Sequence, residues 1–193
     1  VVEAGGKYCQ SDTSLMRLRF LSTVLAEFDE SPWRPPHRAT LFIGTHDSSS
    51  HKIGAWLRLP EPLALTDKQR LERRELLAGH KAAEDPRFIF ISAPIPARFL
   101  QLNIDAQEYF SLLCLLLVLL QRFGWVLQVC RHLVIAGDNM HVLHSEAAAG
   151  RGSLDMLRFA EEIDLLQLRN GFLLSYTRVS TKDNTLSDLP SRF

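Results

Sequence analysis

Four acidic residues lie far apart in the sequence, and each stands where a fold could bring its carboxylate to a shared site. Asp47 and Asp138 each end an apolar run, Glu108 opens a long apolar stretch, and Asp188 follows a polar turn. Carboxylates that cluster raise one another's pKa, so such a site makes physical sense only when a cation neutralises it. The chemistry that this set indicates is hydrolysis assisted by divalent metal.

The type of these side chains also indicates which metal they would bind. All four offer only oxygen, which suits hard cations, whereas Zn²⁺ would call for His or Cys in the set. We therefore expect Mg²⁺, with Mn²⁺ as a possible substitute. His132, His141 and His144 lack a fourth ligand at suitable spacing, so we interpret them as ordinary surface or partly buried residues.

The elements that must position these acids follow from the periodicity of apolar residues. The segments expected to be strands are 39–47, 53–59, 87–95, one of 125–129 and 132–139, and 172–179. The segments expected to be helices are 11–28, 103–123 and 153–170, the second of them capped by Asn103 or Asp105. This order predicts an α/β fold with a mixed sheet, three antiparallel strands and then parallel strands, flanked by helices. Asp47 and Asp138 would meet if their strands are neighbours, with the helix of Glu108 crossing nearby.

A Pro-rich segment at 31–38 marks the expected domain boundary, because successive prolines remove backbone donors and disfavour helix. We expect a helical segment at 1–35 and a main domain at 36–193, with a charged helical insertion at about 61–86 between strands. The chain begins without Met and stops just after the motif around Asp188, so both ends look cut from something longer.

Composition excludes some classes of protein. Twenty-two basic residues balance 22 acidic ones among 193, which argues against a free-standing, tight nucleic-acid binder.

Cys9, Cys114 and Cys130 are odd in number and lack paired metal-ligand spacing, which favours buried free thiols in a reducing compartment. The apolar run 110–120 is shorter than the roughly 18 residues that a membrane span needs. We expect an intracellular protein, cytoplasmic or nuclear, without membrane contact and without a leader.

The segment 173–192, LLSYTRVSTKDNTLSDLPSR, resembles the closing motif of reverse-transcriptase-associated ribonucleases H. It has an apolar strand, a polar turn around Asn184, and Asp188 just before a Ser-Arg ending. FIGTHDSSSHKIGAWL resembles the opening hairpin of that superfamily, with Asp47 as the ligand at the strand end. NIDAQEYFSLL resembles its first helix, with Glu108 pointing inward, and VIAGDNMHVL resembles its fourth strand.

Within that family, GRGSLDMLRFAEEI and STKDNTLSDLPSR look most like the ribonuclease H domains of long-terminal-repeat or DIRS-type retrotransposon polyproteins. The resemblance covers about residues 40–193 and implies a ribonuclease H-like fold that cleaves the RNA strand of RNA–DNA hybrids with two Mg²⁺ ions. It implies that residues 1–35 are the tail of a reverse-transcriptase or connection region. The catalytic and metal-binding residues would be Asp47, Glu108, Asp138 and Asp188. The residues expected to contact nucleic acid are Ser48, Asn139, Asn184 and Arg192.

Several departures from the family leave alternatives open. VSTKDN stands where cellular ribonucleases H carry a His before the last carboxylate, and His46 and the insertion are unusual. Pro190 predicts that Asp188 lies at the very start of a helix. Asp105 could replace Glu108 as the helix ligand. The module could also be a silent scaffold or hybrid-binding platform beside a polymerase, or a related nuclease or transposase that cuts DNA.

Overall fold

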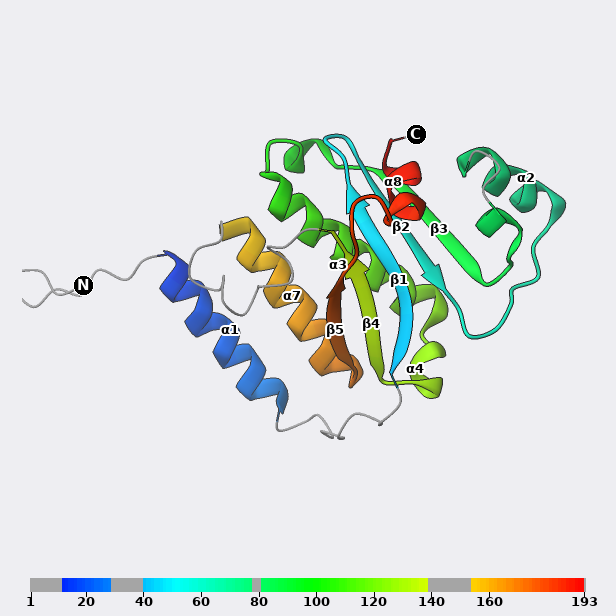
Figure 1. Ribbon diagram of the computed structural model, residues 1–193. Helices are drawn as coiled ribbons and strands as arrows, with labels where there is room; N and C mark the ends of the chain where they lie inside the picture. The colour runs from blue at the N-terminus through cyan, green and yellow to red at the C-terminus, as the bar shows by residue number, and fades with distance from the viewer. Residues whose placement is uncertain (1–11, 29–39, 78–80, 139–153, 193) are drawn as a thin grey trace, which may run out of the picture.

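The computed structural model describes residues 12–28, 40–77, 81–138 and 154–192. A five-stranded mixed sheet lies at its centre, in the order β3-β2-β1-β4-β5 (Figure 1). The strands are β1 (Leu41–Ser48), β2 (Lys52–Arg58), β3 (Phe88–Pro94), β4 (His132–Gly137) and β5 (Leu173–Arg178). The first three pair antiparallel, β4 runs parallel to β1, and β5 runs parallel to β4. The predicted α/β fold class, with three antiparallel and then parallel strands, is confirmed.

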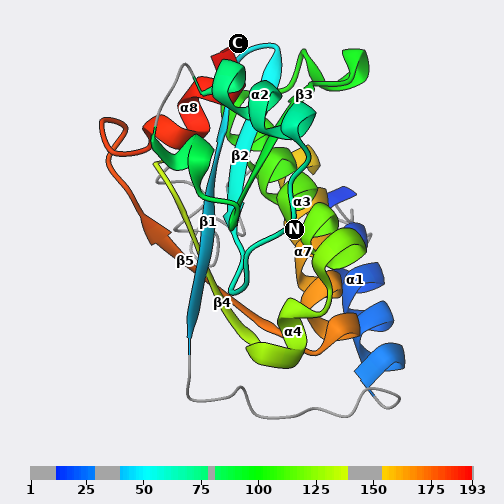
Figure 2. The ribbon, with the colours of Figure 1, turned by 90° about the vertical axis from the view of Figure 1, so that its right-hand side faces the viewer.

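Helices cover both faces of the sheet. The α-helices are α1 (Asp12–Phe28), α2 (Asp67–Leu76), α3 (Ile104–Phe123), α4 (Val126–Val129), α7 (Leu154–Asn170) and α8 (Thr185–Arg192). Two short 3-10 helices are η1 (Lys81–Glu84) and η2 (Ala97–Phe99). Figure 2 shows α3 and α7 on one side of the sheet with α1 beyond α7, and α8 on the opposite side. Of the two candidate strands before position 140, 132–137 is the strand, and the other segment forms α4.

The long helix α3 provides much of the core. The Asn103 side chain accepts a hydrogen bond from the backbone N–H of Ala106, which confirms Asn103 as the cap. Buried α3 residues such as Leu115 form one core cluster with Ile43 and Leu133 of the sheet. By length and apolar composition α3 could cross a membrane, yet half of its apolar window is buried inside the protein. Core helices pass the same test, so packing against the sheet explains this apolar run.

The charged segment between β2 and β3 contains the helices α2 and η1, and one of its arginines lies over a ring of the edge strand β3. Thr66 and Gln69 form a reciprocal capping box at the start of α2. Arg73 of α2 is buried, donates to the backbone oxygen of Asp85 at 2.7 Å, and places its guanidinium 5.4 Å from the Phe90 ring centroid. These contacts connect α2 to the strand that follows it.

The expectation for Asp188 was wrong in one respect. Helix α8 begins at Thr185, so Asp188 is its fourth residue and Pro190 lies inside the helix. A proline there removes one helical hydrogen bond. Pro190 is buried, and its carbonyl accepts a hydrogen bond from the Ser92 Oγ at 2.7 Å. Packing against β3 therefore stabilises a short helix that its sequence alone disfavours.

The segment 31–38, predicted to be a linker, lies outside the described residues, as does Cys9. Cys130 is buried and Cys114 partly buried, and neither forms a disulfide within the described part of the chain. Burial raises the pKa of Cys114 to about 11. These two cysteines are packing residues, as expected from their place in apolar segments.

Candidate metal centre

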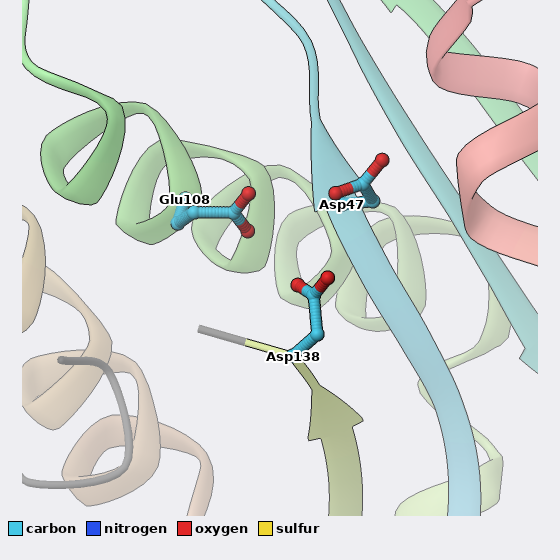
Figure 3. Close-up of side chains that lie close together, drawn as sticks. All are labelled: Asp47, Glu108 and Asp138. Atoms are coloured by element: carbon cyan, nitrogen blue, oxygen red, sulfur yellow. The ribbon is translucent and has the colours of Figure 1, made fainter. Parts of the chain in front are cut away.

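Three of the four predicted ligands meet at the carboxyl ends of the central strands β1 and β4 (Figure 3). Asp47 comes from β1, Glu108 from α3, and Asp138 directly follows β4, with ligand oxygens all within 4.8 Å of one another. Asp47 and Asp138 converge because β1 and β4 are parallel neighbours. Glu108 reaches them because α3 packs across β1. The helix residue of this cluster is Glu108, and Asp105 is not part of it.

The Asp47 carboxylate is partly buried beside other negative charges. Its pKa is raised to about 6, above all by burial and also by the charges of Glu108, Asp138 and Asp188. A hydrogen bond from Ser191 Oγ to Asp47 Oδ2, 2.8 Å long, acts in the opposite direction. A divalent cation between these carboxylates would remove the cost of crowding them.

Glu108 is fixed by contacts to both of its oxygens. It is 3% exposed, and its Oε1 accepts hydrogen bonds from the Ser48 backbone N–H at 3.0 Å and the Ser48 hydroxyl at 2.9 Å. Its Oε2 lies 3.2 Å from Nδ1 of the fully buried His46, at ion-pair distance but outside hydrogen-bond geometry. The other ring nitrogen, Nε2, is hydrogen-bonded to the Tyr176 hydroxyl at 2.5 Å. Burial, and then the nearby acids, raise the pKa of Tyr176 well above its ordinary value.

The polar residues of the closing motif attach α8 to β1. Asn184 donates from its amide to the backbone oxygen of His46 at 3.2 Å, and the Ser187 and Thr45 hydroxyls are hydrogen-bonded. Ser191 reaches Asp47, as described above. The motif therefore positions the last helix beside the acids.

Asp188 is not a member of the three-acid group. Its Oδ1 lies 2.6 Å from the Arg192 Nε, one helical turn further along α8. Its negative charge nevertheless contributes to the raised pKa of Asp47. Asp188 therefore lies near the cluster but is paired with a neighbouring cation, and its role as a fourth ligand stays a prediction.

The residues predicted to contact nucleic acid are in different surroundings. Ser48 and Asn184 are buried, and the hydrogen bonds described for them organise the site. Arg192 is exposed, and Asn139 lies outside the described residues. Contact of these four residues with nucleic acid stays a prediction.

Sequence reasoning missed three residues of the site. His46 was noted only as unusual, whereas Tyr176 and Ser191 were given no role at the site. Ser191 was visible within the Ser-Arg ending of the motif. Tyr176 reaches His46 because β5 and β1 lie on either side of β4. That contact could be predicted only once the strand order was known.

The donor set fits a hard divalent cation. Asp47, Glu108 and Asp138 present only oxygen, they are at least partly buried, and the Glu108 Oε2 has no hydrogen-bond partner in the described part of the chain. Mg²⁺ and Mn²⁺ prefer such ligands.

The sequence matches no family model, and no curated protein is significantly similar to it. Among solved structures, the chain is similar to the RNase H1 of the halophilic archaeon Halobacterium salinarum NRC-1, with a TM-score of 0.48 and 15% sequence identity. The alignment covers 78% of this chain and 92% of that chain. A likeness this distant assigns neither a family nor an activity to this chain.

Proposed function

We propose that this chain hydrolyses the RNA strand of RNA–DNA hybrids with two Mg²⁺ ions, as the ribonuclease H part of a retrotransposon reverse transcriptase. The observation that carries the proposal is the convergence of Asp47, Glu108 and Asp138 from β1, α3 and β4. The choice of substrate is supported by the sequence motif over residues 173–192, whose Asn184, Ser187 and Ser191 form hydrogen bonds to β1.

In this proposal each acid has its own part. Asp47 and Asp138 would hold the ions, and Asp188, released from Arg192, would complete the second ion's site. Glu108, fixed by Ser48, would bind one ion and orient the attacking water. When bound, such ions activate the water and stabilise the leaving 3′ oxygen of an in-line phosphodiester hydrolysis. No covalent nucleophile is required.

Selectivity for RNA–DNA hybrids would depend on contacts to 2′-hydroxyls on one strand and on the fit of a deoxyribose backbone on the other. Ser48, Asn139, Asn184 and Arg192 are our candidates for such contacts. Because the net charge is zero, we expect a neighbouring reverse-transcriptase domain to provide part of the binding surface.

The test is cleavage of a labelled RNA–DNA hybrid with Mg²⁺, run beside duplex DNA and duplex RNA, with binding recorded in the same samples. The wild-type chain should cut only the RNA strand of the hybrid. Asp138→Asn should bind the hybrid without cutting it, whereas Asp164→Asn, at an exposed acid on α7, should behave as wild type. Cleavage of duplex DNA would identify a related nuclease. Hybrid binding without cleavage in either Mg²⁺ or Mn²⁺ would instead identify a scaffold.

A further inference from the structure

A buried histidine beside the acids is not used by the proposed chemistry. His46 is 0% exposed, and its Nδ1 lies 3.2 Å from the Oε2 of Glu108. Neither atom has a hydrogen-bond partner elsewhere among the residues that the structure describes. A buried donor or acceptor left unpaired is costly. The His46 Nδ1 and the Glu108 Oε2 are therefore the polar neighbours of one another.

The opposite side of the His46 ring is occupied by Tyr176 from β5, whose hydroxyl is hydrogen-bonded to Nε2. Gly137, the residue before Asp138, provides the space for this contact. A Cβ at Gly137 would lie 1.8 Å from the Tyr176 hydroxyl oxygen and 3.3 Å from the His46 Nε2. Gly137, which precedes the candidate ligand Asp138, therefore leaves room for the contact between His46 and Tyr176. His46 in turn contacts the candidate ligand Glu108.

The two neighbours of the His46 ring together decide which ring nitrogen carries the proton in a neutral imidazole. A carboxylate can only accept a hydrogen bond, whereas a phenol can donate or accept, so the hydrogen of the imidazole lies on Nδ1, next to Glu108, and the Tyr176 hydroxyl donates to Nε2. The other tautomer would place a lone pair against that carboxylate. Metal-binding carboxylates and histidines are commonly oriented in this way by hydrogen-bonding neighbours.

We propose that Tyr176 and His46 are positioning residues that hold the Glu108 carboxylate in the orientation that binds metal. The inference rests on the proposed function, because it concerns the ion that Glu108 would bind. His46 faces Oε2 while Ser48 donates two hydrogen bonds to Oε1, so the carboxylate is restrained on both oxygens and keeps a lone pair of Oε2 for a cation. The chain of contacts runs from β5 through β1 to α3.

Two substitutions of His46 separate its two contacts. An Asn side chain places its amide nitrogen near the position of Nδ1, so His46→Asn keeps a donor for Glu108 and loses the partner of Tyr176. A Gln side chain reaches the position of Nε2, so His46→Gln keeps a partner for Tyr176 and loses the donor. Tyr176→Phe removes only the hydroxyl.

The experiment measures Mn²⁺ affinity by electron paramagnetic resonance, the Mg²⁺ concentration for half-maximal hybrid cleavage, and the urea midpoint of unfolding. We expect His46→Gln to weaken metal binding by about 10- to 100-fold, Tyr176→Phe to weaken it less, and His46→Asn to stay within a few-fold of wild type. His132→Gln is the matched control. His132 is also a strand histidine whose Nε2 is hydrogen-bonded to a hydroxyl, that of Ser175 at 2.6 Å, but it lies outside the acid cluster. This substitution should leave the affinity unchanged.

Equal metal affinity in His46→Asn and His46→Gln would overturn the inference, and so would affinities that simply follow the unfolding midpoints. The failure of the proposed function would look different. In that case the wild-type chain itself would neither bind Mn²⁺ at the cluster nor cleave the hybrid. A wild-type chain that binds and cleaves, together with a His46→Gln variant of normal affinity, would remove only the positioning role.

Discussion

At the residue scale, the site brings acids together at a cost that the metal-free protein must bear. Asp47 is the residue in which this cost is visible, because its pKa is raised from 3.8 to about 6, first by burial and then by neighbouring carboxylates. Below about pH 4 the side chain is protonated in both the folded and the unfolded chain. Between about pH 4 and pH 6 the folded chain keeps the proton while the unfolded chain loses it. The free energy of unfolding therefore falls as the pH rises through this range.

We therefore expect metal-free wild-type protein, kept in a chelator, to lose stability between about pH 4 and pH 7 through Asp47. Asp47→Asn should lack this loss and should be more stable than wild type at pH 7.5, by on the order of 1–3 kcal/mol, since the Ser191 hydroxyl can still donate to its amide oxygen. Urea unfolding at several pH values checks this. An Asn variant that is no more stable than wild type at pH 7.5 would contradict the cost that burial and the neighbouring acids impose on the Asp47 charge.

At the element scale, the position of α8 depends on a glycine in β2. A Cβ at Gly54 would lie 2.2 Å from the backbone oxygen of Ser187 and 2.4 Å from the backbone nitrogen of Ser191. The helix therefore packs directly on the strand backbone. This close approach puts Ser191 on Asp47 and brings Asp188 near the acids.

Gly54→Ala should push α8 away from the sheet and cost about 1–3 kcal/mol of stability. Hybrid cleavage should fall by more than tenfold, because Ser191 and Asp188 move together. Gly171→Ala is a suitable control, since Gly171 has a φ of +61° and lies between α7 and β5. It should also lose stability but keep its activity per folded molecule. Normal cleavage by a well-folded Gly54→Ala protein would show that α8 does not position the site.

The elements that the sequence predicted well are those with strong local patterns. The β1–β2 hairpin has a short, largely buried apolar run on each side of a Ser-rich turn, and α3 has an Asn103 cap and a long apolar run. The convergence of Asp47 and Asp138 was predicted only on the condition that their strands are neighbours, which the sheet order now supplies. The Tyr176–His46 contact and the helical Pro190 depend on packing between distant segments, so local patterns could not predict them.

At the scale of the whole molecule, charge balance limits how the chain can bind nucleic acid. With 22 basic and 22 acidic residues, it has no net field to attract a polyanion. We expect the inactive Asp138→Asn chain to bind hybrid with a Kd of about 1–100 µM at near-physiological salt, weakening as salt rises. A fused reverse-transcriptase region should lower KM for hybrid cleavage with little change in kcat. Nanomolar binding of hybrid by the 193-residue chain alone would contradict the expectation that it needs a neighbouring domain to bind tightly.

The most direct measurement is anomalous diffraction at the manganese edge from crystals of the chain grown with Mn²⁺. We predict an anomalous peak between the carboxylates of Asp47, Glu108 and Asp138, and its loss or strong reduction in Glu108→Gln. Glu162→Gln, at an exposed acid on α7, should keep the peak. The absence of a peak among these three carboxylates at saturating Mn²⁺, in crystals where their positions are clear, would contradict the metal centre.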